Sequence, residues 1–388
     1  MYKKTGDTAL IKKINTAVVL DAIIKQAPLS RAKISEQTGL NKATVSSLVQ
    51  DLIDNHLVLE IGPGQSSGGR KPVMLLFNNT AGYAVGIDLG VNYIRGVLTD
   101  LEGSVVAELD KALLRHDTGS VLPELYECIE TLIMQAPKSP YGVVGIGMGV
   151  PGIVDDHGSI LFAPNLEWEH VELEKLLSER FNLPVIIDNE ANAGAQGEQK
   201  YGAGRGIPHQ IYVSVGIGIG TGIILNKELY KGASGFSGEL GHLSIELGGK
   251  PCRCGNQGCW ELYASENALL ERAENLGFGD LTGLLRAAES GNEEVAALFR
   301  SIGEFLGAGI ANIINVFNPD VVIIGNRMSR AEAWIGDAVR ETVERRTLPY
   351  HRRHMHILFA ELGEQSAVRG SAYYAISQFF NRVKDGGK

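Results

Sequence analysis

The first 78 residues carry apolar positions at helical spacing, followed by two short apolar runs. The spacing predicts three helices, at residues 11–24, 31–38 and 42 to about 55. In the first of them the repeating apolar positions are Ile11, Ile14, Val18 and Ile24. Ser30 and Asn41 are typical N-cap residues, and Gly39 is typical of a helix end. Two helices joined by a short turn with glycine predict a helix-turn-helix.

The second helix of this pair presents short polar side chains and one cation toward solvent. Hydroxyl and amide groups can reach base edges in a major groove, and cations can reach phosphates. A helix-turn-helix places its second helix in that groove. The sequence therefore predicts double-stranded DNA as a partner, with candidate contacts at Arg31, Lys42, Ala43, Thr44, Ser46, Ser47 and Gln50.

Two apolar runs, at residues 57–61 and 73–77, read as strands that flank a loop rich in glycine and serine. The loop ends in two adjacent cations, Arg70 and Lys71, which could reach phosphates or a minor groove. On composition alone the loop could also be a linker. The preceding helices favour a wing, so we expect a winged helix-turn-helix that is mainly α-helical.

The remaining chain alternates strands with helices, which indicates an α/β fold. The expected strands are 83–90, a hairpin from 95 to 106, 142–149, 185–188, 211–215 and 223–225, with a glycine-rich loop at 216–222. A helix near 123–135 and a closing helix near 370–382 are also expected, the latter packed on the first lobe. This order resembles the two-lobed actin-like fold. The predicted domains are 1–78, 79–188 plus 365–388 as first lobe, and 189–364 as second lobe.

Charge is distributed unevenly along the 388 residues. Residues 1–78 contain ten Lys or Arg and six Asp or Glu, a net charge of +4. The whole chain carries −9, so the remainder carries −13. A basic head on an acidic body suggests that only the head meets a polyanion. No apolar run reaches the ~18 residues of a membrane span, and we expect a cytoplasmic protein without membrane contact.

Three of only four cysteines lie within eight residues of one another, with a histidine upstream. Cys₃His is a common ligand set for tetrahedral structural Zn²⁺. Gly255 and Gly258 allow the tight turns that such closely spaced ligands need. The alternatives are a chance cluster of buried thiols or a disulfide, and the latter is disfavoured without an export signal. The predicted ligands are His242, Cys252, Cys254 and Cys259.

The stretch Gly238-Glu239-Leu240-Gly241-His242, followed by Cys-x-Cys-Gly-x-x-Gly-Cys-x-Glu, resembles the signature of the ROK family. That family groups bacterial sugar kinases with sugar-responsive repressors, and the resemblance runs from about Gly82 to about Arg369. It implies that zinc holds a loop against a sugar site, with His242 facing metal and sugar through different ring nitrogens. The sugar site that it implies comprises Asn165, Asn189, Glu190, Glu239, His242 and Glu261.

The nucleotide-binding positions depart from the kinases of the family. Val91 stands where a second glycine of the first phosphate loop belongs, and Ile217 replaces a threonine of the second. Asn326-Arg327 adds long side chains where adenosine would sit. Glu190 replaces the catalytic Asp and extends its carboxylate by about one methylene, enough to misplace a base. We therefore expect no enzymatic activity.

These features together predict a repressor that binds operator DNA as a homodimer and is released by a monosaccharide. The resemblance extends to the stretches 40–47, 64–75 and 258–265, and implies D-xylose as the inducer. One alternative is a ROK sugar kinase with an appended DNA-binding domain, which ATP turnover would reveal. Another is a regulator controlled by a peptide or protein, with a vestigial sugar cleft, for which sugar would not release the operator.

Overall fold

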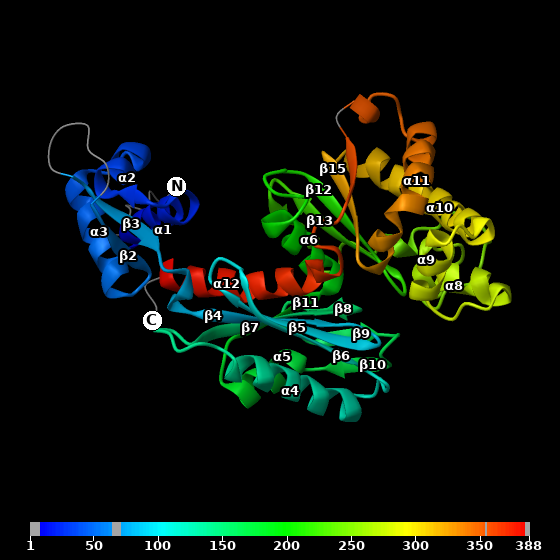
Figure 1. Ribbon diagram of the computed structural model, residues 1–388, viewed down its shortest axis with the longest axis horizontal. Helices are drawn as coiled ribbons and strands as arrows, with labels where there is room; N and C mark the ends of the chain where they lie inside the picture. The colour runs from blue at the N-terminus through cyan, green and yellow to red at the C-terminus, as the bar shows by residue number, and fades with distance from the viewer. Residues whose placement is uncertain (1–7, 64–70, 354, 385–388) are drawn as a thin grey trace, which may run out of the picture.

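The computed structural model describes residues 8–63, 71–353 and 355–384. A small head and two α/β lobes follow one another along the chain (Figure 1). The last helix returns from the second lobe to the first and ends beside the head. The actin-like two-lobed arrangement expected from the sequence is therefore present.

The head contains three helices and a three-stranded sheet of order β1-β3-β2. Its elements are α1 (Thr8–Gln26), β1 (Leu29–Ser30), α2 (Arg31–Thr38), α3 (Lys42–Asp54), β2 (Val58–Pro63) and β3 (Val73–Phe77). The caps agree with the prediction, since the Ser30 and Asn41 side chains accept backbone N–H bonds from Lys33 and Thr44. Gly39 ends α2 in the left-handed conformation.

The buried side of α1 differs from the side marked by its apolar repeat. Val19, Leu20 and Ile23 are fully buried, whereas Ile14 is 54% exposed and Val18 is 40% exposed. The helix is apolar on both sides, and periodicity alone could not indicate which side packs against α2 and α3.

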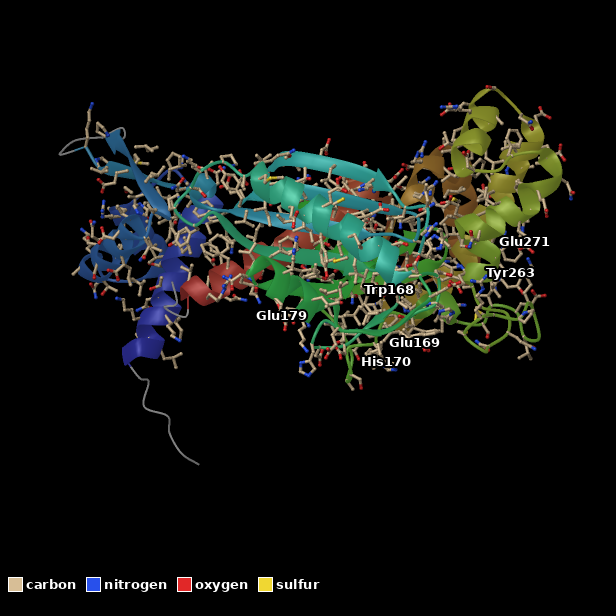
Figure 2. The ribbon with its side chains drawn as sticks, turned by 90° about the horizontal axis from the view of Figure 1, so that it is seen from below. Trp168, Glu169, His170, Glu179, Tyr263 and Glu271 are labelled. Carbon is tan, nitrogen blue, oxygen red and sulfur yellow. The ribbon has the colours of Figure 1, made fainter. Side chains whose placement is uncertain are left out.

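The first lobe is built on a five-stranded sheet of order β11-β7-β4-β5-β6. Its strands are β4 (Tyr83–Leu89), β5 (Tyr93–Asp100), β6 (Val105–Ala112), β7 (Val143–Val150) and β11 (Val185–Asn189). Helices α4 (Thr118–Met134) and α5 (Leu173–Phe181) cover one face, and α12 (Ser366–Lys384) covers the other (Figures 1 and 2). A smaller sheet of β8 (Ile153–Val154), β9 (Ile160–Ala163) and β10 (Trp168–Val171) adjoins it. Trp168, labelled in Figure 2, is buried, and its Nε1 donates to the His116 carbonyl at 2.6 Å.

The second lobe has a five-stranded sheet of order β14-β13-β12-β15-β16. Its strands are β12 (Gln210–Val215), β13 (Ile219–Leu225), β14 (Glu228–Leu229), β15 (Val321–Gly325) and β16 (His356–Phe359). Its helices are α7 (Glu261–Ala264), α8 (Glu266–Ala273), α9 (Leu281–Glu289), α10 (Glu293–Phe317) and α11 (Glu332–Arg346). The expected loop at 216–222 is shorter than predicted, because β13 begins at Ile219 and pairs with β12 across a tight turn.

Within the described ranges, α10 alone has the length and apolar composition of a membrane span. Eleven of its residues are buried, and they pack into the core of the second lobe. Its hydropathy therefore fits the central helix of a folded lobe.

Helix α12 lies unusually close to the first-lobe sheet because glycines face it. A Cβ added at Gly147 would lie 1.8 Å from the Ser371 carbonyl oxygen, and one at Gly86 would lie 2.4 Å from that of Val368. Further along, Ala375, Ile376 and Phe379 belong to the same apolar cluster as the head. The head and the first lobe are thus joined by a continuous core.

Helices α6 (Glu190–Tyr201) and α12 cross at the junction of the two lobes. Glu198 of α6 is fully buried and accepts bonds from the Leu362 amide at 3.0 Å and the Ser366 hydroxyl at 2.7 Å. Leu362 lies in the link between β16 and α12, and Ser366 is the first residue of α12, so Glu198 holds the point where the chain passes between the lobes.

Candidate functional site

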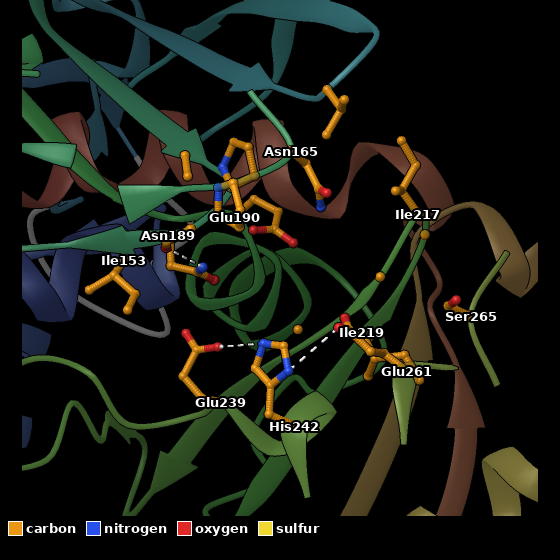
Figure 3. Close-up of a pocket in the computed structure, with 18 of the residues that line it drawn as sticks. Ile153, Asn165, Asn189, Glu190, Ile217, Ile219, Glu239, His242, Glu261 and Ser265 are labelled. Atoms are coloured by element: carbon orange, nitrogen blue, oxygen red, sulfur yellow. Dashed lines mark hydrogen bonds and ion pairs between the residues drawn. The ribbon is translucent and has the colours of Figure 1, made fainter. Parts of the chain in front are cut away.

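A cavity of about 790 Å³ lies between the two lobes. First-lobe loops after β4, β7 and β11 line one side of it, and second-lobe segments around residues 235–242 and 251–271 line the other. All six residues predicted for the sugar site line this cavity: Asn165, Asn189, Glu190, Glu239, His242 and Glu261. Asn165, Asn189 and Glu190 lie opposite Glu239, His242 and Glu261 in Figure 3.

The first-lobe side is organised by the junction of β11 and α6. Asn189 is the N-cap of α6, where its Oδ1 accepts from the Ala191 amide at 2.8 Å. Its Nδ2 donates to the Gly152 carbonyl at 3.0 Å, which ties the turn after β7 to the same point. Because both ends of the amide are held, Asn189 presents a fixed orientation to the cavity.

Glu190 is held among other acidic groups at the base of the cavity. Burial, followed by the nearby Asp88 and Glu239 carboxylates, raises the pKa of Glu190 to about 8. At neutral pH this carboxyl is therefore mostly protonated, and it can donate a hydrogen bond as well as accept one.

His242 lies between two carboxylates on the second-lobe side. Its Nε2 is 3.9 Å from Glu239 Oε2, and its Nδ1 is 3.5 Å from Glu261 Oε1 (Figure 3). The short helical turn Leu240–His242 packs closely against β13. A Cβ at Gly241 would lie 2.0 Å from the Ile219 carbonyl oxygen, so only glycine fits there. The two carboxylates and the imidazole thus form a polar wall that can accept and donate hydrogen bonds.

The four predicted metal ligands, which include His242 of this wall, lie close together. The ligand atoms of His242, Cys252, Cys254 and Cys259 all lie within 4.8 Å of one another. Cys254 Sγ is 3.7 Å from Cys259 Sγ, and Cys252 Sγ is 3.7 Å from His242 Nδ1. With Zn–S bonds of about 2.3 Å, two sulfurs of a tetrahedral site lie about 3.8 Å apart. The donor set and its spacing therefore fit a tetrahedral ion such as Zn²⁺.

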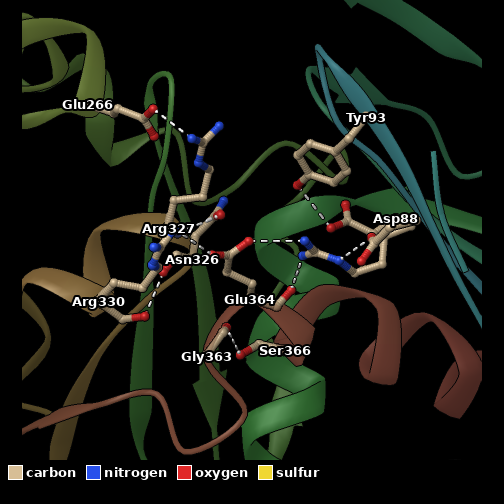
Figure 4. A network of polar contacts seen from close by, with 12 residues as sticks. Asp88, Tyr93, Glu266, Asn326, Arg327, Arg330, Gly363, Glu364 and Ser366 are labelled. Carbon is tan, nitrogen blue, oxygen red and sulfur yellow. Dashed lines mark hydrogen bonds and ion pairs between the residues drawn. The ribbon is translucent and has the colours of Figure 1, made fainter. Parts of the chain in front are cut away.

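Asn326 and Arg327, at the positions where the sequence predicted the loss of nucleotide binding, line the cavity and form polar contacts with the chain's own residues (Figure 4). Arg327 forms an ion pair with buried Glu266 at 3.2 Å. Asn326 donates from Nδ2 to the Ser214 hydroxyl at 3.0 Å, while its Oδ1 accepts from the Arg327 amide. Val91 and Ile217 line the same cavity.

A chain of ion pairs joins the two lobes at this end of the cavity. Arg95 of β5 donates to the Glu364 carbonyl at 2.6 Å and pairs with its carboxylate at 3.0 Å. Arg330 of the second lobe approaches the same carboxylate at 3.6 Å. Beside Arg95, burial raises the pKa of Asp88 to about 6, and Tyr93 donates to this carboxyl at 3.0 Å.

A second ion pair crosses the cleft near the predicted sugar site. Lys231, which follows β14 of the second lobe, is 3.1 Å from Asp188 at the end of β11. The sequence did not predict the contacts between the lobes made by Asp188, Lys231, Arg95 and Glu364. The Arg95 and Glu364 partners lie 269 residues apart, and no local pattern links them.

The predicted DNA contacts lie mainly on the outer face of α3. Lys42, Ala43, Ser46, Ser47 and Gln50 are exposed, and Thr44 is half-buried. Lys71 is exposed just before β3, whereas Arg70 lies outside the described residues. Arg31 differs from the others because it pairs with Glu60 of β2 at 2.7 Å, which holds α2 against that strand.

Known proteins resemble this chain over its whole length. The ROK family model matches residues 84–378. The "Xylose repressor" of Bacillus spizizenii is 43% identical over 383 residues, which cover 98% of this chain and 99% of that protein. The crystal structure of a ROK family transcriptional regulator, a homologue of the Escherichia coli MLC protein, superposes with a TM-score of 0.81 at 28% identity and 97% coverage of both chains. A Streptomyces griseus ROK glucokinase, solved with glucose and AMPPNP, gives a TM-score of 0.70 at 30% identity. The match covers 76% of this chain and 99% of the glucokinase. The chain belongs to the ROK family.

Proposed function

We propose that this protein is a transcriptional repressor that binds operator DNA through its head and leaves it when a monosaccharide enters the cleft. One observation carries the proposal: the sugar half of the cavity retains its polar wall, whereas the nucleotide half is engaged by Arg327, Glu266 and Asn326. The similarity to the Bacillus xylose repressors along the head and both lobes supports D-xylose as the inducer.

The cleft suits a small polyhydroxylated ring. Glu239 and Glu261 accept hydrogen bonds, His242 and protonated Glu190 donate them, and the Asn189 amide is held in one orientation. A sugar hydroxyl that loses a buried partner costs about 1–3 kcal/mol, so these groups would set affinity and selectivity.

The coupling between cleft and head is proposed to run along α12. The helix begins beside the ion pairs of Glu364, packs on the first-lobe sheet, and ends within the head core. When sugar draws the lobes together, the second lobe would rotate relative to the first lobe and the head. In a homodimer this rotation would change the separation of the two α3 helices, which must match half-sites about one DNA turn apart or a multiple of it. The sugar must favour the non-binding state for release to follow.

We further propose that a structural Zn²⁺ joins His242, Cys252, Cys254 and Cys259. The close packing of these donors supports the assignment. The metal would fix the loop that carries His242 and leave the opposite ring nitrogen of His242 to face Glu239 and the cavity.

A kinase with a DNA-binding head remains the alternative function, supported by the similarity to ROK glucokinase. The position of Glu190, in place of the catalytic Asp, and the Arg327–Glu266 ion pair argue against it. A regulator controlled by a peptide would leave the polar wall of the cleft without a role.

The central experiment replaces Glu239 with Ala. The loss of one hydrogen-bond acceptor from the cavity wall should weaken xylose binding by up to about two orders of magnitude, since about 1.4 kcal/mol corresponds to a factor of ten. Operator affinity without sugar should stay unchanged, because Glu239 lies in the second lobe. Electrophoretic mobility shifts with rising D-xylose measure both quantities, and Glu228→Ala, an exposed change in the same lobe, is the control. If the Glu239→Ala variant releases the operator at the same D-xylose concentration as wild type, the proposal is refuted.

The raised pKa of Glu190 predicts a pH-dependent stability. Its folded pKa of about 8 exceeds the ordinary value of 4.5 in the unfolded chain. The protonated carboxyl therefore contributes stability that is complete below pH 4.5 and is lost as the pH rises through 8. Glu190→Gln, which cannot ionise, should gain thermal stability relative to wild type between pH 5 and 8.5. The measurement is the difference in melting temperature between Glu190→Gln and wild type, taken at pH 5 and again at pH 8.5. If this difference is the same at both pH values, the carboxyl is already ionised in the folded protein.

Metal analysis tests the zinc assignment. The purified wild-type chain should contain one zinc per molecule, and Cys254→Ser should lose it because three ligands hold the ion less tightly. This variant should still bind the operator, and D-xylose should no longer release it. Cys128→Ser, at the buried thiol of the first lobe, should retain the metal. Wild-type preparations free of zinc would contradict the assignment.

Salt dependence tests the DNA-binding face. Neutralising a cation that contacts a phosphate should lower the slope of log affinity against log salt by about one. We expect this for Lys42→Gln and Lys71→Gln, and not for Lys138→Gln, an exposed lysine of the first lobe. Changes at Ser46 or Ser47 should alter sequence preference more than salt dependence. An unchanged slope in both head variants would reject this face.

A further inference from the structure

The Asp188 carboxylate lies at the end of β11, where the two lobes meet, and Asp188 is only 6% exposed. Its two oxygens have different partners. Oδ1 accepts from the Asn189 amide at 2.8 Å and from Asn192 Nδ2 at 2.9 Å, both in the segment that continues from Asp188. Oδ2 instead pairs with the Lys231 ammonium of the second lobe at 3.1 Å. The partner of Oδ2 therefore depends on where the second lobe stands.

Lys231 belongs to a closed segment that also carries part of the predicted sugar site. Within this segment the Lys231 carbonyl accepts from the Ser237 amide at 3.1 Å, and the Ser237 hydroxyl donates to the Tyr230 carbonyl. The Gly238 carbonyl accepts from the Thr221 hydroxyl of β13, which ties the end of the segment to the second-lobe sheet. Glu239 follows directly, so Lys231 and Glu239 move together with the second lobe.

A second donor lies near the same carboxylate, on α12. The Tyr374 hydroxyl is buried and has no hydrogen-bond partner among the residues that the structure describes. Burial first, and then the charge of Asp188, raise the pKa of Tyr374 well above its ordinary value, so the two groups are neighbours. The residues that follow along α12, Ala375, Ile376 and Phe379, belong to the apolar cluster of the head. A change at Tyr374 therefore acts on the part of α12 that enters the head.

We propose that Asp188 is a switch carboxylate, which is bonded to Lys231 in the arrangement described here and to Tyr374 when a rotation of the lobes withdraws Lys231. A buried carboxylate that loses its cation requires another donor, and a buried hydroxyl without a partner is equally unfavourable. Tyr374 satisfies both requirements at once. The inference rests on the proposed function, in which sugar and operator favour different arrangements of the lobes.

The switch has a signature that a merely structural contact lacks. Lys231→Met removes the ammonium and keeps the aliphatic stem, so it disfavours the arrangement described here. Tyr374→Phe removes the hydroxyl and keeps the ring, so it disfavours the other arrangement. The two substitutions must therefore shift one equilibrium in opposite directions, and each ligand must report that shift through its preference for one arrangement.

Two separate titrations of the full chain test the switch: calorimetry with D-xylose in the absence of DNA, and mobility shift of the operator in the absence of sugar. One variant should tighten xylose binding and weaken operator binding, and the other should do the reverse. For each variant the Kd of at least one ligand should change about threefold or more. The double variant should return toward wild type. Lys227→Met, an exposed lysine just before β14, and Tyr373→Phe, on the same helix as Tyr374, should leave both affinities unchanged.

The inference is overturned if both variants shift the same ligand in the same direction, or if Tyr374→Phe behaves like Tyr373→Phe. Either ligand alone can decide the question. If D-xylose bound none of these proteins, opposite shifts in operator affinity would still establish the switch, and the failure would count against the sugar of the proposed function only.

Discussion

The structure depends on the close contact between α12 and the first-lobe sheet. Gly86 and Gly147 permit the helix backbone to approach the strands more nearly than any side chain would allow. At one end α12 starts from the link that Glu198 and Arg95 hold, and at the other it packs into the head. A rigid element with one end at the cleft junction and the other at the DNA-binding head can transmit a lobe rotation without a flexible intermediate.

Ion pairs of the chain's own residues join the two lobes. Arg95, Glu364 and Arg330 form one such bridge. Lys231 and Asp188 form a second bridge nearer the sugar half. Under the proposed mechanism both bridges would have to adjust when the lobes rotate, and would contribute to the free energy against which sugar binding acts.

Local signals predicted the helices and strands of the head well. N-caps, glycine ends and turn residues located α2, α3 and β3, because those features depend on nearby residues. The six predicted cleft residues line one cavity because a contiguous motif supplies half of them. The start of β13 was predicted wrongly, since it depends on pairing with β12. The apolar spacing predicted the helix α1 and could not indicate its buried side, which depends on packing partners elsewhere. The ion pairs between the lobes join residues too distant along the chain for any sequence pattern to indicate.

The central claim is that sugar alone, without a nucleotide, releases the DNA. The most direct test mixes the purified protein, an operator duplex selected from random sequence, and D-xylose, and follows the bound fraction by fluorescence anisotropy. The account predicts full release without ATP, an unchanged xylose midpoint when ATP is added, and no formation of ADP. Release that requires ATP, or that accompanies the phosphorylation of xylose, would contradict it.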